Sequence, residues 1–378
     1  MMTGPAARAQ SDAQARPEAR ALYRKLYALS RNFEDGKIIY GHQNAFIEGR
    51  GWSAGANTGW SGGLPESDLH KVIGKDPGVV GYDFAAIGPW NEELVAGQMR
   101  LLHQKGAVIT LSWHMPDFSA DGTETRAWAA GGNTVHRVTR DAVFARVFHS
   151  KLDRLVAFLG KIKEVPVIFR PWHEQNRSWF WWGKSRCTAD EYRALWRMTS
   201  DYLKEKGIHQ LLYAYSPTTV KEDYFDRYPG DDQVDILGVD AYFGSIADNL
   251  YDYGLSPLDQ WKREVIALMA AADRHGKIPA ITEFGNEGIT YRNFWTDYFS
   301  TPIGRDGMRW FSSLHGLSEP VLKPAYAMLW RNDRSHPQHW FSPFPGAPGN
   351  PDFKEMVSKN IFSFLGDEMA GKGPRSLL

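Results

Sequence analysis

The chain alternates short β-rich apolar runs with amphipathic helical segments along most of its length, and this alternation limits the fold more than any other feature. Strands that alternate with helices form a parallel sheet covered by helices. Eight such units in 378 residues fit one (β/α)₈ TIM barrel with loop insertions. The eight predicted strands span residues 37–42, 79–84, 108–114, 165–174, 211–217, 234–242, 278–285 and 325–332.

Nearly every predicted strand ends in a polar or aromatic cluster, such as Ser-Trp-His at 112–114 or Asp-Ala-Tyr at 240–242. In a (β/α)₈ barrel the carboxyl ends of the strands and the loops after them form the active site, so this placement predicts a site at that end. Long loops follow the first, third and eighth strands, at 45–65, 116–138 and 333–350. We expect these loops to wall a cleft.

Residue types typical of helix ends separate the strands. Pro89 is placed to open a helix and Gly106 to close it, while Thr188 and Glu191 form a capping box for the next one. Another helix is predicted to begin at Ser256-Pro257. We find no internal repeat and no low-complexity linker, which favours a single domain.

The first residues differ in composition from the rest of the chain. Residues 1–16 are rich in Ala, Gln, Arg and Pro, and they lack the apolar stretch of a signal peptide. We therefore expect a disordered leader at 1–16 and the catalytic domain at 17–378, with the first helix starting at Pro17.

Composition excludes several classes of function. The formal charge is zero and the pI is near 7.2, so the chain lacks the excess of basic residues typical of nucleic-acid binding. No apolar run is long enough to predict a membrane span. The single Cys187 cannot form an internal disulfide. Fifteen Trp residues suggest either extra core packing or platforms for the flat faces of sugars.

The fourth predicted strand ends in the densest chemical cluster of the chain, at 170–183. Glu174 follows His173 and precedes four aromatic residues within eight positions. Apolar walls around a carboxyl group raise its pKa, which is what a general acid requires. The alternative is an ordinary loop glutamate beside a hydrophobic cluster.

A second glutamate, Glu283, ends the seventh predicted strand in Pro-Ala-Ile-Thr-Glu-Phe-Gly at 279–285. A barrel would bring it to the same face as Glu174. Two carboxyl groups about 5 to 5.5 Å apart on different strands are the apparatus of retaining glycoside hydrolysis. The pair therefore predicts a glycosidase.

Several strings of the sequence resemble glycoside hydrolase family 26, whose members are mainly β-mannanases. They are Tyr-Gly-His-Gln at 40–43, Arg-Pro-Trp-His-Glu with Trp-Phe-Trp-Trp-Gly at 170–183, Tyr-Pro-Gly-Asp-Asp at 228–232, Thr-Glu-Phe-Gly at 282–285 and Leu-Trp-Arg-Asn at 329–332. The resemblance runs from about residue 38 to 346. It implies a retaining enzyme that cleaves β-1,4-mannosidic linkages in mannan, glucomannan or galactomannan.

The same resemblance implies a role for individual residues. Glu174 would be the acid/base and Glu283 the nucleophile. Arg331 would bind the sugar at subsite −2. The remaining predicted contacts surround the sugar at subsite −1 or the cleavage site, and they are His114, His173, Trp179, Tyr242 and Trp330. The strings at 112–117 and 175–177 depart from the commonest family pattern.

Three further residues have a structural reading beside the functional one. Arg170 lies two and four positions before Trp172 and Glu174, on the inward side of its strand, so it needs a buried partner such as Glu283. Asp83 and His42 end the second and first strands. Each is either a substrate contact or part of a hydrogen-bonded scaffold.

Other functions have weaker support. Gly-Trp-Ser-Gly-Gly at 59–63 matches the nucleophile elbow of serine hydrolases, but Ser61 lacks the strand before it and the helix after it. Metal, phosphate and dinucleotide motifs are absent from the sequence, so we expect no cofactor and no metal. Alternatives are a β-1,3-xylanase, a mixed-linkage β-glucanase, or a non-catalytic carbohydrate-binding barrel. We expect a monomer that is secreted or periplasmic.

Overall fold

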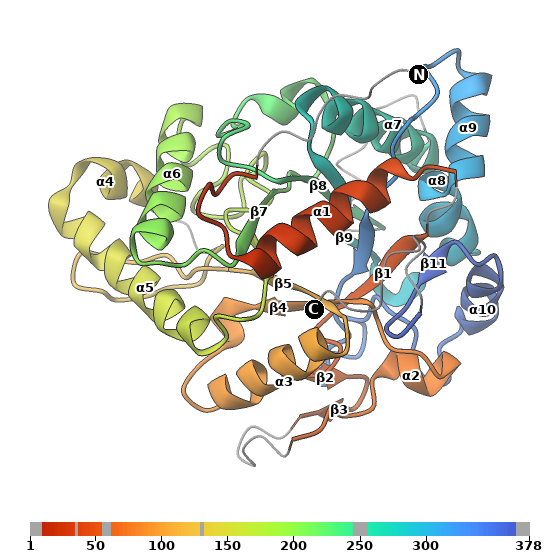
Figure 1. Ribbon diagram of the computed structural model, residues 1–378, viewed down its shortest axis with the longest axis horizontal. Helices are drawn as coiled ribbons and strands as arrows, with labels where there is room; N and C mark the ends of the chain where they lie inside the picture. The colour runs from red at the N-terminus through yellow and green to blue at the C-terminus, as the bar shows by residue number, and fades with distance from the viewer. Residues whose placement is uncertain (1–9, 35–36, 55–61, 129–131, 245–255, 368–378) are drawn as a thin grey trace.

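The computed structural model describes residues 10–34, 37–54, 62–128, 132–244 and 256–367, which form a closed eight-stranded parallel barrel (Figure 1). Closure is shown by β10, which pairs with both β9 and β1. In barrel order the strands are β1 (Ile38–Gln43), β4 (Val79–Asp83), β5 (Val108–Ser112), β6 (Val167–Arg170), β7 (Leu211–Tyr215), β8 (Ile236–Phe243), β9 (Ile278–Asn286) and β10 (Tyr326–Leu329). The predicted (β/α)₈ fold is therefore confirmed.

Helices lie between successive strands and cover the outside of the barrel (Figure 1). The α-helices are α1 (Pro17–Arg31), α2 (Asp68–Ile73), α3 (Glu92–Gln104), α4 (Thr134–Arg140), α5 (Ala142–Lys161), α6 (Ala189–Glu205), α7 (Pro257–His275), α8 (Thr301–Ile303), α9 (Arg305–Leu314) and α10 (Asn350–Ser358). Short 3₁₀ segments are η1 (Phe84–Ala86), η2 (Glu222–Phe225) and η4 (Glu287–Ile289), and η5 (Phe294–Ser300) is a π-helix. Three short strands complete the fold: β2 (Glu48–Gly49), β3 (Trp52–Ser53) and β11 (Phe362–Ser363).

Helix α1 crosses the amino-terminal end of the barrel and closes it (Figure 1). Its buried residues pack with the first inward residues of the strands, among them Ile39, Val79 and Ile278, in one apolar cluster. The rest of the core lies between the barrel wall and the outer helices. Because apolar residues fill the amino-terminal end, polar side chains inside the barrel gather at the carboxyl end.

The eight strands are found where the sequence predicts them, but the fourth and the eighth are shorter at both ends. The structure ends β6 at Arg170, whereas the prediction extended it to Glu174. Pro171 follows and has no N–H group to donate to a neighbouring strand. Trp172 and Glu174 then adopt left-handed backbone angles, with φ of 52° and 56°. The acid/base candidate therefore lies on a turn.

Most predicted helix signals are confirmed. The side chain of Thr188 accepts a hydrogen bond from the N–H of Glu191 in a capping box, and Ser256 caps α7. The predicted opening of α3 at Pro89 is wrong, since the helix begins at Glu92. Asn91 holds the preceding turn, because its side chain accepts from the N–H of Gly88 and donates to the carbonyl of Ala86.

Residues 10–16, part of the predicted leader, contact the amino-terminal end of the barrel. The N–H and hydroxyl of Ser11 donate to the two carboxylate oxygens of Asp235, at 2.7 Å each. Asp12 pairs with His209 at 2.9 Å, and the N–H of Arg16 donates to the carbonyl of His209. Packing thus begins upstream of Pro17, and residues 1–9 lie outside the described residues.

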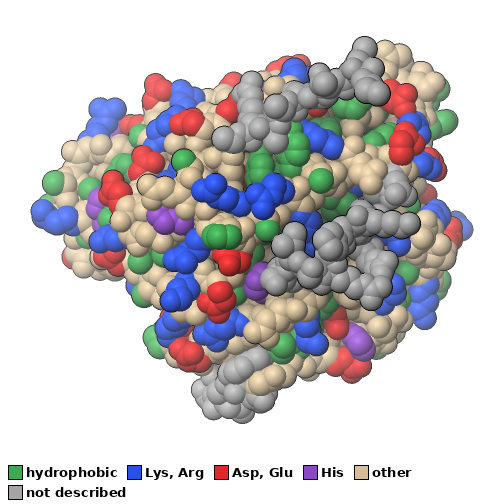
Figure 2. All heavy atoms as spheres, in the orientation of Figure 1, with side chains coloured by type: hydrophobic (Ala, Val, Ile, Leu, Met, Phe, Trp, Pro, Cys, Tyr) green, Lys and Arg blue, Asp and Glu red, His purple; other side chains and the backbone are tan. Residues whose placement is uncertain are grey.

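Acidic and basic side chains are interspersed on the face that α1 crosses, without a large patch of one sign (Figure 2). No helix in the described part of the chain is both long enough and apolar enough to cross a membrane.

Candidate active site

The turn after β6 is fixed by bonds from three neighbouring segments, and this positions Glu174. The N–H of Glu174 donates to the carbonyl of Ser216 at 2.8 Å. The hydroxyl of Tyr192 donates to the carbonyl of Trp172, and Nε1 of Trp182 donates to that of His173. Non-glycine residues with positive φ cost free energy, and such residues persist where surrounding bonds over-determine them. The backbone therefore presents the Glu174 carboxyl group in one direction.

A β-bulge positions the second glutamate. The register of β9 against β8 shifts by one residue, so that Val239 pairs with Ile281 and Asp240 with Glu283. Bulges re-aim side chains next to active sites. Here Thr282 donates to Asp240 Oδ1 at 2.7 Å, while Glu283 accepts from Arg170 through Oε1 and from Tyr242 through Oε2. Because of the bulge, the side chains of the adjacent residues Thr282 and Glu283 both form hydrogen bonds inside the barrel.

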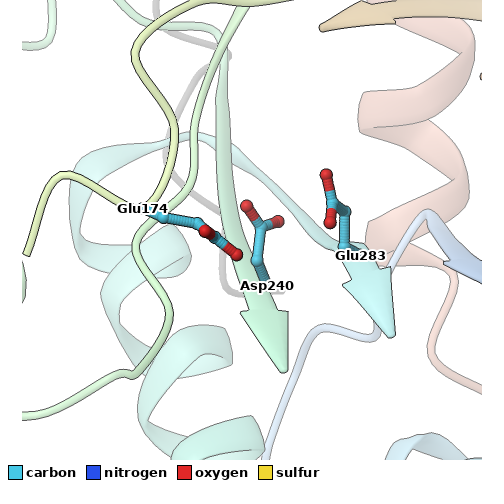
Figure 3. Close-up of side chains that lie close together, drawn as sticks. All are labelled: Glu174, Asp240 and Glu283. Carbon is cyan, nitrogen blue, oxygen red and sulfur yellow. The ribbon is translucent and has the colours of Figure 1, made fainter. Parts of the chain in front are cut away.

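Three carboxyl groups converge at this point (Figure 3). An oxygen atom from each of Glu174, Asp240 and Glu283 lies within 4.8 Å of the others, and all three residues are buried. Retaining glycosidases have their two carboxyl groups about 5–5.5 Å apart, and inverting ones about 6.5–9.5 Å apart. The separation between Glu174 and Glu283 fits the retaining class.

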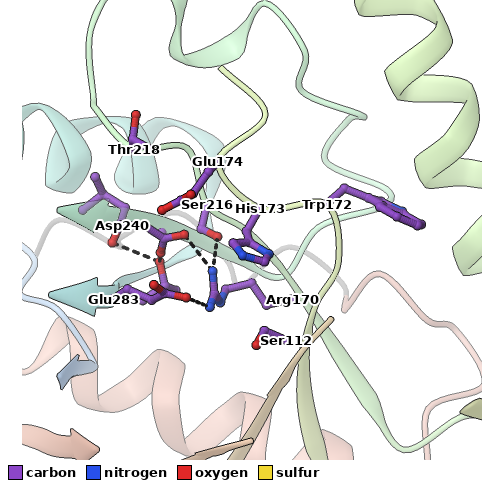
Figure 4. A network of polar contacts seen from close by, with 12 residues as sticks. Ser112, Arg170, Trp172, His173, Glu174, Ser216, Thr218, Asp240 and Glu283 are labelled. Atoms are coloured by element: carbon purple, nitrogen blue, oxygen red, sulfur yellow. Dashed lines mark hydrogen bonds and ion pairs between the residues drawn. The ribbon is translucent and has the colours of Figure 1, made fainter. Parts of the chain in front are cut away.

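One guanidinium group forms ion pairs with two of these carboxyl groups. Arg170 is buried, and its Nη1 donates to Asp240 Oδ2 at 2.7 Å and to the Ser216 hydroxyl at 3.2 Å, while Nη2 donates to Glu283 (Figure 4). The pairing with Glu283 is the one expected from the sequence. The three carboxylates are close enough to hold a metal ion, but Arg170 already supplies a positive charge to two of them.

Burial and neighbouring charges separate the two glutamates electrostatically. Burial raises the pKa of Glu174 well above its usual range, and the charges of Glu283 and Asp240 raise it further. A bond of 2.7 Å from Trp179 Nε1 to Glu174 Oε2 opposes this shift. The protonated form of Glu174 is therefore favoured over its charged form. Glu283 accepts hydrogen bonds from Arg170 and Tyr242.

A chain of polar contacts runs along one side of the carboxylates, from Asp83 through His114 to His173. Asp83 Oδ2 lies 2.5 Å from His114 Nδ1, and His114 Nε2 lies 3.2 Å from His173 Nε2. Burial alone would lower the pKa of His114, but the Asp83 carboxylate raises it overall. Burial and the charges of Arg170 and His114 lower the pKa of His173 well below its usual value. His114 therefore donates through Nδ1 to Asp83, and one hydrogen bond joins the Nε2 atoms of His114 and His173.

Aromatic rings surround the histidines. The ring of Trp330 lies 6.0 Å from that of His114, and Trp179 is 37% exposed while its Nε1 reaches Glu174. Trp128, in the loop after β5, lies 6.4 Å from His114 and is 56% exposed. These exposed indoles can stack on a sugar ring, whereas Trp181 and its neighbour at 182 are core.

Two other predicted residues lie away from the carboxylate cluster. His42, on β1, is buried with both ring nitrogens unpaired among the described residues, and burial lowers its pKa to about 4. Within the described part of the chain, no hydrogen bond joins His42 to Glu174 or Glu283. Arg331 follows β10, where its Nη1 donates to Glu48 at 2.9 Å and to Asp333 at 2.8 Å.

Residues 11–308 match the family model for glycosyl hydrolase family 26. The chain belongs to this family. The match starts upstream of the resemblance seen in the sequence, and it stops before the Leu-Trp-Arg-Asn string at 329–332.

Relatives and solved structures of family 26 extend over nearly the whole chain. A mannan endo-1,4-β-mannosidase of Bifidobacterium adolescentis is 31% identical over 93% of this chain, which spans 35% of that protein. A β-mannanase structure from Bacteroides ovatus has a TM-score of 0.75 at 31% identity, covering 93% of this chain and 96% of that one. The catalytic domain of an endo-β-1,4-mannanase from Bacillus sp. JAMB-750 has a TM-score of 0.79 at 28% identity, covering 96% and 95%.

Two residues next to the predicted site, Asp240 and Trp128, were not predicted from the sequence. Asp240 precedes Tyr242 by two positions on one strand, so the two share a face, and that spacing was the available signal. Trp128 lies within a long loop, where spacing gives no signal. Ser61 of the rejected nucleophile elbow lies outside the described residues.

Proposed function

We propose that this family 26 protein is a retaining β-mannanase that works by double displacement. Glu283 attacks the anomeric carbon while Glu174 protonates the leaving oxygen, and a covalent glycosyl-enzyme forms. Glu174 then removes a proton from the water that releases the sugar. The observation that supports this best is that one carboxylate oxygen of Glu174 and one of Glu283 lie within 4.8 Å of each other.

The environments of the two glutamates support this division of roles. An acid must hold its proton until the leaving oxygen takes it, and the raised pKa of Glu174 satisfies this. A nucleophile must be ionised and correctly aimed. Arg170 and Tyr242 each donate to one oxygen of Glu283, which fixes the orientation of the carboxylate.

The substrate is inferred from relatives and from the ring of polar and aromatic groups at the site. The family 26 relatives named above are mannan endo-1,4-β-mannosidases or β-mannanases. Around the carboxylates, we assign sugar contacts at or next to subsite −1 to His114, His173, Trp179, Tyr242 and Trp330, and a contact at subsite −2 to Arg331. We further propose that the chain acts as a monomer outside the cytoplasm, where polymeric mannan is accessible.

Product analysis tests the function. Linear mannan and galactomannan should yield β-1,4-manno-oligosaccharides, whereas β-1,3-xylan and mixed-linkage β-glucan should not be cleaved. Proton NMR of the earliest products should show the β-anomer first, because double displacement retains configuration. An initial α-anomer would exclude the nucleophilic role of Glu283. Cleavage of xylan or glucan in preference to mannan would overturn the assigned substrate.

A further inference from the structure

Two carboxylates from different loops hold the guanidinium group of Arg331. Glu48 lies in the loop after β1 and Asp333 in the loop after β10, and both accept from Nη1. The side chains of Arg331, Glu48 and Asp333 are 26%, 16% and 17% exposed. Among the described residues, Nε and Nη2 of Arg331 have no hydrogen-bond partner, and neither atom is buried. These N–H groups are therefore available to a ligand.

Glu48 is itself held in place by the loop that contains it. Its Oε1 also accepts from Asn44 Nδ2 at 3.2 Å, and its N–H donates to the carbonyl of Asn44. Glu48 begins β2, which pairs in antiparallel fashion with β3. The carboxylate is thus part of a small hairpin, residues 48–53.

Asp68 ties this hairpin to the end of β10. Its buried carboxylate accepts from the N–H of Arg50 at 2.7 Å, from Trp52 Nε1 at 2.6 Å and from Asn332 Nδ2 at 3.0 Å. Asn332 is the residue after Arg331. The fit is tight, because a Cβ atom at Gly49 would lie 2.2 Å from Trp52 Nε1. The hairpin and the arginine therefore have a common anchor.

We propose that Glu48 is a positioning residue that sets the strength of sugar binding through Arg331. With Nη1 occupied by Glu48 and Asp333, the guanidinium plane is fixed, and Nε and Nη2 are presented to hydroxyl oxygens of a neutral sugar. A donor fixed before binding loses less conformational entropy when the ligand arrives. This inference rests on the proposed role of Arg331 at subsite −2.

The test compares kcat/KM on mannotetraose with kcat/KM on an activated aryl β-mannoside, which leaves subsite −2 empty. The ratio of the two values isolates binding at that subsite. Glu48→Ala should lower the ratio about 3- to 10-fold, between the effects of an exposed ion pair and of a charged hydrogen bond. Glu48→Gln should restore most of it, because its side-chain oxygen still accepts from Nη1. Glu34→Ala, which breaks an exposed pair with Arg309, is the matched control and should leave the ratio unchanged.

The double variant Glu48→Ala/Arg331→Ala separates the two proposals. If Glu48 acts through Arg331, adding Glu48→Ala to Arg331→Ala should lower the ratio no further. A lower ratio in the double variant than in Arg331→Ala would overturn the positioning role of Glu48. The role would also be overturned if Arg331→Ala lowered the ratio and Glu48→Ala did not. An unchanged ratio in Arg331→Ala itself would instead refute the assignment to subsite −2. Melting temperatures of all variants show whether a loss comes from unfolding.

Discussion

Replacing Glu174, the proposed acid/base, should make the protein inactive on mannan and also more stable. Glu174 is buried, and Trp179 Nε1 is its one side-chain hydrogen-bond donor among the described residues. Two other carboxylates lie within 4.8 Å of it. In Glu174→Gln the amide keeps the shape and can accept from Trp179 while donating to a neighbouring carboxylate. The substitution removes an unfavourably placed acid and retains its contacts.

The size of the gain follows from the burial. Burial raises the folded-state pKa of Glu174, and one pKa unit corresponds to about 1.4 kcal/mol, so we expect the free energy of unfolding to be higher in the Gln variant by about 1–3 kcal/mol at pH 7. An unfolding entropy of about 2.1 cal/mol/K per residue gives about 0.8 kcal/mol/K for a chain of 378 residues. The melting temperature should therefore rise by about 1–4 °C.

The gain should depend on pH with a defined sign. Because the folded-state pKa of Glu174 is raised, the folded protein holds this proton after the unfolded chain has lost it. The wild type therefore loses stability as pH rises from the ordinary glutamate range through the folded-state pKa, and the Gln variant does not. Below about pH 4 the carboxyl group is protonated in both states, and the two proteins should melt alike.

Thermal melts of both proteins from pH 3.5 to 8 measure this difference. Glu191→Gln is the control of opposite sign. The hydrogen bond from the N–H of Thr188 lowers the pKa of Glu191, although burial opposes this shift in part. The Glu191→Gln variant should therefore be as stable as the wild type at pH 7, or less stable. If Glu174→Gln were no more stable at pH 7, or if its gain were the same at pH 3.5, the electrostatic account of the site would be wrong.

Four further substitutions test the assigned roles. Glu283→Ala should abolish turnover of every β-mannoside. Glu174→Ala should lower activity on mannan about 10²–10⁴-fold, yet it should still form the glycosyl-enzyme from an aryl mannoside with a good leaving group. If each variant lost as much activity on the aryl mannoside as on mannan, the two assigned roles would be wrong. Trp179→Phe should move the alkaline limb of the pH profile of kcat/KM to higher pH, because it removes a hydrogen bond that lowers the pKa of Glu174. An unmoved limb would mean that another group sets it. Arg170→Met should lower the free energy of unfolding by about 3–5 kcal/mol in urea denaturation, because it leaves two buried carboxylates unpaired, and a loss below 1 kcal/mol would contradict this.

The barrel was predictable because each β/α unit has a local signal. Apolar runs such as 211–217 are short, β-rich and bounded by helix caps such as Thr188, so each element follows from its own residues. The pairing of Arg170 with Glu283 was predictable for a similar reason. An inward arginine on a central strand needs a buried anion, and a carboxylate from another strand end was available.

Other parts of the site depend on contacts between segments distant in the sequence. The left-handed turn at Trp172 and Glu174 is held by carbonyl and side-chain partners at Ser216, Tyr192 and Trp182, and nothing in residues 170–174 alone specifies it beyond Pro171. The same holds for the residues before Pro17, whose packing depends on Asp235 and His209. Periodicity describes single elements and cannot show these bonds.

The two glutamates lie on different kinds of backbone, and this difference matches their different tasks. Glu283, the proposed nucleophile, lies on a strand of the barrel, where a bulge and two hydrogen-bond donors fix the direction of its carboxyl group. Glu174 lies on a turn whose positive φ is maintained by neighbouring segments, close to aromatic rings that exclude water. In the proposed mechanism Glu174 acts first as an acid and then as a base, so its pKa has to fall between the two steps. The neighbouring Glu283 allows this, because once Glu283 is covalently bound to the sugar, its charge no longer raises the pKa of Glu174. The same contact that holds the proton in the first step therefore favours its release and the activation of water in the second.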